Sequence, residues 1–216
     1  LNDEFYHIYN RGVDKRDIFS NQCDLERFFQ SMSEFNVVYP IGSIYKNSFQ
    51  RQKSSRSELG RPTSKRVNIV CYCLNPNHYH FLLEQVYDKG IEKFMHKLST
   101  GYTRYFNDKN QRNGALFQGR FKASHINSND YLLHVSAYVN LNDRIHQLSG
   151  STTQLGMRSS WGEYTNVFPL QSFCKKDMIL DQFNTIDEYK IFAEETMEGI
   201  IESRKEDKKS NNLLLE

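Results

Sequence analysis

The sequence predicts an α+β fold, in which one antiparallel sheet carries helices gathered on one face. This prediction comes from the order of the periodic segments along the chain. Segments with the alternation or composition of strands are residues 4–12, 66–74, 78–86 and 115–126. Segments with helical spacing of apolar residues are 23–35, 90–109 and 128–143. The order strand, helix, strand, strand, helix, strand, helix is that of a ferredoxin-like fold.

Turn and cap residues support the individual elements. The first strand, EFYHIYNRG, breaks at Gly12, and the helix over 23–35 has a cap residue in Ser20 or Asn21. The second and third strands are joined by the turn sequence Asn75-Pro76-Asn77. The helix over 90–109 contains Gly101, which weakens its pattern slightly, and the capped helix over 128–143 is expected to stop near Asp143.

The chain is expected to divide into a main domain and an appendage. Residues 1–150 hold all the elements above, including a basic, Ser-rich loop at 46–66 with seven Lys or Arg against Glu58 alone. A solvated insertion is the favoured interpretation of this loop, and ordering on nucleic acid stays open. Residues 151–216 are expected to contain an irregular segment around Trp161 and an acidic helix at about 185–208 with a frayed end.

Composition narrows the class of protein. The chain has 216 residues, of which 38% are apolar, and its 15 Phe and 13 Tyr are enough to fill a core. No run approaches the ~18 apolar residues of a membrane span. The four cysteines lack the spacing of a zinc site, so the sequence predicts a reduced, cytoplasmic protein.

The net charge of +2 hides an asymmetry between the two parts. Residues 1–150 hold 20 Lys or Arg against 14 Asp or Glu, a balance of +6, and residues 151–216 hold 8 against 12, a balance of −4. The first part is therefore the one suited to a polyanion such as DNA. A surplus of this size permits nucleic-acid binding without requiring it.

Two pairs of residues carry candidate chemistry. His78 and His80 are two apart on a predicted strand, so their side chains share one face and can hold a divalent metal if a third ligand joins them. Tyr138 and Asn142 are four apart on a predicted helix, where a tyrosine can act as a nucleophile and an amide oxygen as a metal ligand. Each pair also has a structural alternative, since histidines on a strand are often part of the packing and Tyr138 lies on an apolar stripe.

Six successive blocks of the chain resemble one known family. They are FYHIYNRG, YCLNPNHYHFLL, STGYTRYFN, LFQGRFK, YLLHVSAYVNLN and SSWGEY. In this order they are similar to the blocks of the IS200-like tyrosine transposases, and most similar to the transposase-like proteins associated with repetitive extragenic palindromes (REP). The resemblance runs from about Phe5 to Tyr164.

The resemblance implies an HUH-type endonuclease and strand transferase that acts on single-stranded DNA near a hairpin. It implies that His78 and His80 bind a divalent metal, Mg²⁺ or Mn²⁺, that Asn142 is the third ligand, and that Tyr138 forms a 5′-phosphotyrosine link. Two positions depart from the family pattern. Asn75 stands where the family usually has Met, and Asp143 follows Asn142 where the family usually has Pro.

Basic and aromatic residues are candidates for contacts with DNA. The candidates for contacts with the DNA backbone are Arg11, Arg104, Arg120 and Lys122. Tyr102, Tyr105 and Phe117 can stack on bases, although a core position is favoured for each. A hairpin-binding module or domesticated regulator without catalysis is the alternative function, and a metal-stabilised structural protein is a third. The sequence leaves open whether the protein is a monomer or a homodimer.

Overall fold

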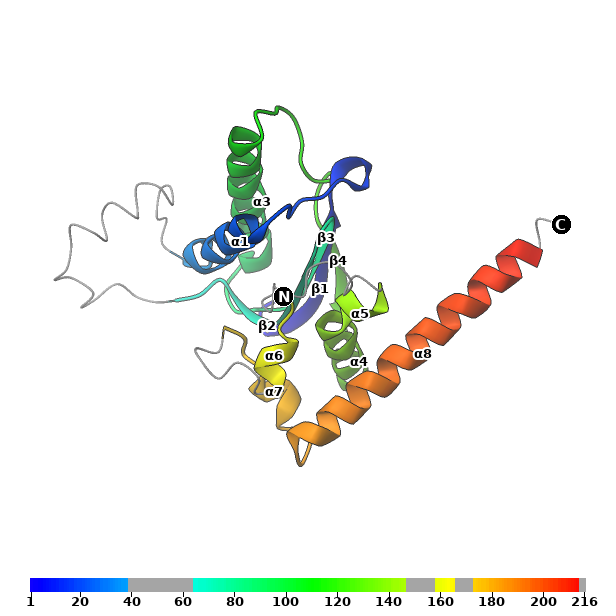
Figure 1. Cartoon of the computed structure of the whole chain (residues 1–216). Coiled ribbons are helices and arrows are strands. Elements are labelled where there is room, and N and C mark those ends of the chain that lie inside the picture. The colour runs from blue at the N-terminus through cyan, green and yellow to red at the C-terminus, as the bar shows by residue number, and fades with distance from the viewer. Residues whose placement is uncertain (39–63, 147–157, 166–172, 214–216) are drawn as a thin grey trace.

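The computed structural model describes residues 1–38, 64–146, 158–165 and 173–213 of the chain. Most of the basic loop predicted at 46–66 therefore lies outside the described residues. Within them the predicted α+β fold is confirmed, with a sheet at the centre and helices on both sides of it (Figure 1).

The described strands form one antiparallel sheet in the order β2-β3-β1-β4, which is the ferredoxin-like order. The strands are β1 (Glu4–Arg11), β2 (Val67–Asn75), β3 (His78–Gln85) and β4 (Lys122–Ile126). The central strand β1 pairs with β3 on one side and with β4 on the other. The turn at Asn75-Pro76-Asn77 joins β2 to β3 as predicted.

The two faces of the sheet carry different helices. α1 (Gln22–Phe35) and α3 (Gly90–Lys109) cover the face of Tyr79 and Phe81, where the Phe28 ring packs 5.8 and 6.3 Å from those two rings. α4 (Asn129–Asn140) lies on the other face, the face of His78 and His80 (Figure 1). The prediction that helices gather on one face therefore holds for α1 and α3, and α4 takes the opposite face.

The α1–α3 pair depends on close approach of the two helices. Asn21 caps α1 by accepting a hydrogen bond from the backbone N–H of Asp24 at 3.2 Å, as the sequence predicted. α3 begins and ends where predicted, and Gly101 lies against the Phe35 ring of α1. The glycine that weakened the helical pattern is thus the residue that lets the two helices pack together.

Two predicted boundaries are wrong. The strand expected at 115–126 is shortened to β4: Phe117 still bridges Gly12, but the chain turns between this bridge and β4, where Gly119 has a φ of 77°. The helix expected at 128–143 ends at Asn140, and a separate short helix, α5 (Asn142–Ile145), follows. Tyr138 and Asn142 therefore do not share one continuous helix.

The C-terminal part packs onto the same body. Residues 158–160 run along the outer edge of β2, where Leu74 N–H donates to Arg158 O at 2.7 Å and Ser160 N–H donates to Tyr72 O at 3.0 Å. The short helices α6 (Trp161–Tyr164) and α7 (Asp177–Leu180) follow, and α8 (Ile186–Leu213) then packs along α4. α8 runs past residue 208, where its predicted end was placed.

A buried polar network fixes α8 against α4. The Tyr189 hydroxyl accepts a hydrogen bond from Asn140 Nδ2 at 2.8 Å, and Ser160 Oγ donates to Asn140 Oδ1 at 2.6 Å. All three residues are fully buried. Because both ends of the Asn140 amide are satisfied, the network positions α8 and residues 158–160 relative to the helix that carries Tyr138.

Among the described residues, no helix is both long enough and apolar enough to span a membrane. The cysteines are free thiols; Cys23 is exposed, and Cys71, Cys73 and Cys174 are buried.

Replacing Gly101 with alanine is expected to destabilise the fold, because the new Cβ would lie 2.7 Å from Cε2 of Phe35 and the ring would have to move. We expect the free energy of unfolding, measured by urea denaturation, to fall by about 1–3 kcal/mol. Gly199→Ala in α8 is the matched control, since no atom lies within 4 Å of the place that its new Cβ would take. That change should raise stability by up to about 1 kcal/mol through helix propensity, and equal effects of the two substitutions would contradict the packing argument.

Stability is expected to fall in mildly alkaline solution because burial raises the pKa of the Cys71, Cys73 and Cys174 thiols well above the usual value. The unfolded chain loses these protons above about pH 8.5 and the folded chain keeps them, so each thiol can remove about 1.4 kcal/mol per pH unit. Denaturation between pH 7.5 and 9.5 should show a shallower decline for Cys71→Ala/Cys174→Ala than for the control Cys23→Ala. Parallel declines for the two variants would refute this explanation.

Candidate active site

The face of the sheet under α4 brings polar side chains from three strands into register. Directly paired residues of neighbouring strands point to the same face. His80 pairs with Tyr9, and Tyr9 pairs in turn with Lys122 on β4. His78 pairs with Arg11 at the end of β1. This face therefore carries both histidines predicted as ligands and two of the four basic residues predicted to contact DNA.

A second pair of histidines joins the predicted pair. His7 Nε2 lies 2.9 Å from His80 Nδ1, with the two rings stacked at 5.1 Å. The His146 ring, just after α5, lies 5.1 Å from the His78 ring. Sequence reasoning missed His7 and His146 as residues of this site. The signal for His7 was available, since the predicted strand order places β1 beside β3, whereas nothing in the sequence pointed to His146.

α4 brings Tyr138 to these histidines. Ser128 caps the helix by accepting from the N–H of Tyr131 at 3.2 Å, and Leu132, Val135 and Val139 bury its inner side. The half-buried Tyr138 ring then lies edge-on to the His80 ring at 5.5 Å and to the His7 ring at 5.7 Å.

Asn142 reaches His78 from α5. Its Oδ1 lies 3.3 Å from His78 Nε2, and both atoms lie close to the Asn75 Nδ2 group, at 2.7 and 2.9 Å respectively. The other ring nitrogen of His78, Nδ1, lies 2.6 Å from Asn77 Oδ1. A carboxamide N–H group, which carries a partial positive charge, thus lies between two acceptors that a metal ion would use.

The donor set fits a divalent cation. Neighbouring ligands of a Mg²⁺ ion lie roughly 3 Å apart, close to the 3.3 Å between His78 Nε2 and Asn142 Oδ1. Among the residues that the structure describes, no group of three His, Cys, Asp or Glu side chains could hold a metal ion. Asn142 supplies an amide oxygen there. If His80 donates from Nδ1 to His7, its Nε2 keeps a lone pair for a metal.

Burial keeps these imidazoles neutral. It lowers the pKa of His7 to about 4, and together with the smaller effect of His146 it lowers the pKa of His78 to about 4. Burial also lowers the pKa of His80 well below the usual value, and the charges of neighbouring histidines and of Arg204 act in the same direction. Neutral imidazole is the form that binds a metal, so the cluster has its ligand form at pH 7.

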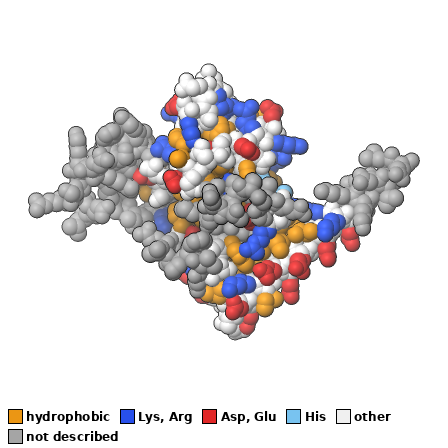
Figure 2. Space-filling view, viewed as in Figure 1, with side chains coloured by type: hydrophobic (Ala, Val, Ile, Leu, Met, Phe, Trp, Pro, Cys, Tyr) orange, Lys and Arg blue, Asp and Glu red, His pale blue; other side chains and the backbone are white. Residues whose placement is uncertain are grey.

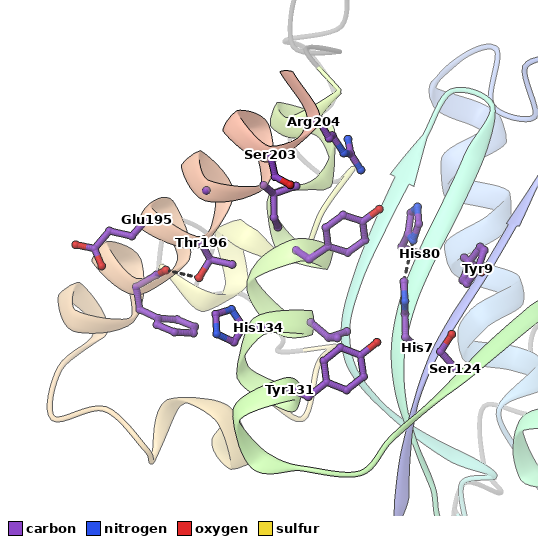
Figure 3. A pocket seen from close by; sticks show the side chains of 15 residues that line it. His7, Tyr9, His80, Ser124, Tyr131, His134, Glu195, Thr196, Ser203 and Arg204 are labelled. Carbon is purple, nitrogen blue, oxygen red and sulfur yellow. Dashed lines mark hydrogen bonds between the residues drawn. The ribbon is translucent and has the colours of Figure 1, made fainter. Parts of the chain in front are cut away.

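A cavity of about 1020 Å³ opens beside the histidines. Its polar side is formed by His7, Tyr9, His80 and Tyr138, and α8 forms the opposite wall (Figure 3). A phosphate group and a nucleotide can be accommodated in a space of this size. Tyr138 lines the cavity together with the imidazoles of His7, His80 and His134.

The remaining predicted residues lie at different distances from this cavity. Lys122 Nζ lies 6.0 Å from the centre of the Tyr9 ring, and Arg11 lies beside His78 with its guanidinium 3.4 Å from Gln118 Oε1. Arg120 is exposed just before β4. Arg104 is exposed on α3, on the far face of the sheet, and the structure does not bring it to the site.

The aromatic residues considered for base stacking have structural positions. Tyr102 and Phe117 are buried in the core, and the Tyr105 hydroxyl donates to Asp24 Oδ1 at 3.1 Å. The core position favoured for Tyr102 and Phe117 therefore agrees with the structure.

Asn75→Met tests the role of the shared amide. Without it, His78 Nε2 and Asn142 Oδ1 lose their common donor, so the metal-free protein should lose about 1–3 kcal/mol of unfolding free energy. Affinity for Mn²⁺, measured by electron paramagnetic resonance, should rise because a metal no longer has to displace the amide. Asn68→Met, on the same strand and bonded to Glu84 instead, is the control and should leave the Mn²⁺ affinity unchanged. Weaker Mn²⁺ binding in Asn75→Met would contradict this arrangement.

Part of the chain is similar to a known protein family. The family model for IS200-like transposases matches residues 51–142, a segment that contains His78, His80, Tyr138 and Asn142. No curated protein matches the chain. A solved structure described as the REP-associated tyrosine transposase bound to a REP hairpin aligns with a TM-score of 0.48 and 11% identity, over 80% of this chain and 85% of that chain. Over this matched segment the chain is similar to the IS200-like transposases.

Proposed function

We propose that the protein cleaves and rejoins single-stranded DNA next to a hairpin, with Tyr138 as the nucleophile. The observation that carries this proposal is the position of Tyr138, whose ring lies 5.5 Å from His80 in a cavity shared with His7. The similarity of residues 51–142 to the IS200-like transposases supports the same reaction class.

The proposed chemistry is an exchange of phosphodiester bonds. Tyr138 Oη attacks the scissile phosphorus and loses its proton, the bond from phosphorus to the 3′ oxygen breaks, and that oxygen leaves as a 3′-OH. The 5′ end stays on Tyr138 as a phosphotyrosine. Attack by another 3′-OH reverses the step and joins two strands. No nucleoside triphosphate is needed, because the phosphotyrosine bond retains the energy of the cleaved phosphodiester bond.

The ligands proposed for a divalent metal are His78, His80 and Asn142. When bound there, Mg²⁺ or Mn²⁺ supplies Lewis-acid polarisation of a non-bridging phosphate oxygen. The residues of the chain orient this site in two ways. His7 holds the His80 ring through the 2.9 Å contact of their nitrogens, and Asn77 holds the His78 ring from the opposite nitrogen.

The DNA backbone is proposed to follow the basic edge of the histidine face. Lys122 and Arg11 lie on that face in register with Tyr9 and His78, which supports the proposal that they contact phosphates near the cut. Arg120 is proposed to contact the strand beyond them. Arg104 can contact DNA only where a hairpin reaches the α3 side. We also propose that residues 1–150 form the nuclease domain and 151–216 an appended segment.

Covalent trapping tests the proposal directly. Hairpin oligonucleotides with single-stranded flanks, labelled at the 5′ or the 3′ end, are incubated with the protein and Mn²⁺ and run on a denaturing gel. We expect an adduct on the strand 3′ of the cut for the native chain, and at least about 10³-fold less for Tyr138→Phe. The matched control is Tyr131→Phe, which removes an exposed hydroxyl from the same helix and the same cavity and should leave the adduct intact.

Two further arms separate the alternatives. His78→Ala/His80→Ala and added EDTA should both abolish the adduct while leaving hairpin binding. A chain that binds hairpins and never forms an adduct, over several flanking sequences and metals, would instead be the hairpin-binding module. Unfolding on chelation without any DNA binding would indicate a structural metal protein.

A further inference from the structure

The C-terminal helix forms one wall of the Tyr138 cavity. Its residues on that wall are Phe192, Glu195, Thr196, Gly199, Ile200, Ser203 and Arg204. Their spacing of three and four residues is that of one helical face. Small side chains at 196, 199 and 203 leave open space in the middle of this face, so the cavity lies between α8 and the sheet (Figure 3).

Arg204 is the basic residue at the end of this helical face. Its side chain extends from α8 toward the side of the cavity where His80 lies (Figure 3). Its charge is among the causes that lower the pKa of His80 and His146, both after burial. Among the residues that the structure describes, no carboxylate forms an ion pair with it, in contrast to Lys190, which pairs with Asp187 at 2.8 Å.

The cavity has charge at both ends of the α8 face. Glu195 also lines it, nine residues before Arg204, which corresponds to about 13 Å along a helix. Ile200 lies on α8 between the two charged residues, and Val135 and Phe192 add further apolar side chains to the cavity lining. The end that holds Arg204, His80 and Tyr138 is therefore suited to an anion, and the middle is suited to an apolar or aromatic group such as a base.

We propose that Arg204 binds a phosphate of the single strand in the Tyr138 cavity, so that α8 is part of the DNA-binding site. The proposal rests on the proposed function, and it adds a phosphate ligand that lies 66 residues beyond Tyr138. Figure 2 shows acidic side chains along α8, and Glu195, the acidic residue of the described part of α8 that lines the cavity, lies nine residues before Arg204. Arg204 lies on the side of α8 that lines the cavity, where the single strand is proposed to bind.

Salt-dependent binding tests the proposal. Fluorescence anisotropy with a labelled hairpin carrying a single-stranded flank is measured in EDTA at several salt concentrations, so that no cleavage occurs. Arg204→Gln should weaken binding about 10-fold and reduce the slope of log K against log salt by about 0.7, the value for one lost phosphate contact on a single strand. Arg204→Lys should keep the native slope because it keeps the charge.

The matched control is Lys205→Gln, which removes the same charge from the next, exposed residue outside the cavity. It should bind and depend on salt as the native chain does. Equal behaviour of Arg204→Gln and Lys205→Gln would overturn the proposal, and so would a loss in Arg204→Lys as large as in Arg204→Gln. If the native chain forms the Tyr138 adduct on the same oligonucleotide, only the role of Arg204 falls; if it neither binds nor cleaves, the proposed function falls with it.

Discussion

The pairing of β1 with β3 is the constraint on which the site depends. Eight consecutive residue pairs link Glu4–Arg11 to His78–Gln85, so the register cannot slip by one residue without turning every histidine to the other face. This pairing sets His7 beside His80 and Tyr9 opposite it, and β4 then adds Lys122 to the same row. Helix α4 needs only to cover this face for Tyr138 to meet the imidazoles. Much of the candidate chemistry is therefore a property of the sheet.

One face of the sheet carries a hydrophobic core, and the other carries the candidate site. Phe28 and Tyr79 pack on the α1–α3 face, where fully buried aromatic rings supply much of the stability. The opposite face carries histidine and asparagine side chains at positions where the first face carries apolar ones. Burying such groups is unfavourable unless they are hydrogen-bonded, and the contacts of Asn75 with His78 and Asn142 meet that requirement in the absence of metal. The site is thus organised before any cation binds.

The periodicity and turn residues of the sequence predicted most of the secondary structure. They failed at boundaries that depend on contacts between distant residues. The turn at Asn75-Pro76-Asn77 and the helix over 90–109 follow from periodicity and turn chemistry alone. The shortened β4 does not, because the chain turns at Gly119, which has a φ of 77°, between the bridge of Phe117 to Gly12 and the start of β4. In the site, the His78–His80 pair and Tyr138 were visible in sequence, whereas Asn75, His146 and Arg204 were not. Their positions depend on how the turn, α5 and α8 pack, and residue spacing carries no information about that.

The backbone of residues 158–160 has one more consequence. It occupies hydrogen-bonding groups on the free side of β2, with Leu74 N–H bonded to Arg158 O and Ser160 N–H bonded to Tyr72 O. An exposed strand edge is a template for joining the sheets of two molecules. The chain satisfies this edge with its own later residues, and the opposite edge, β4, begins with the charged Lys122. Pairing of the sheet edges of two molecules is therefore disfavoured at β2. This pairing is a common route to aggregation.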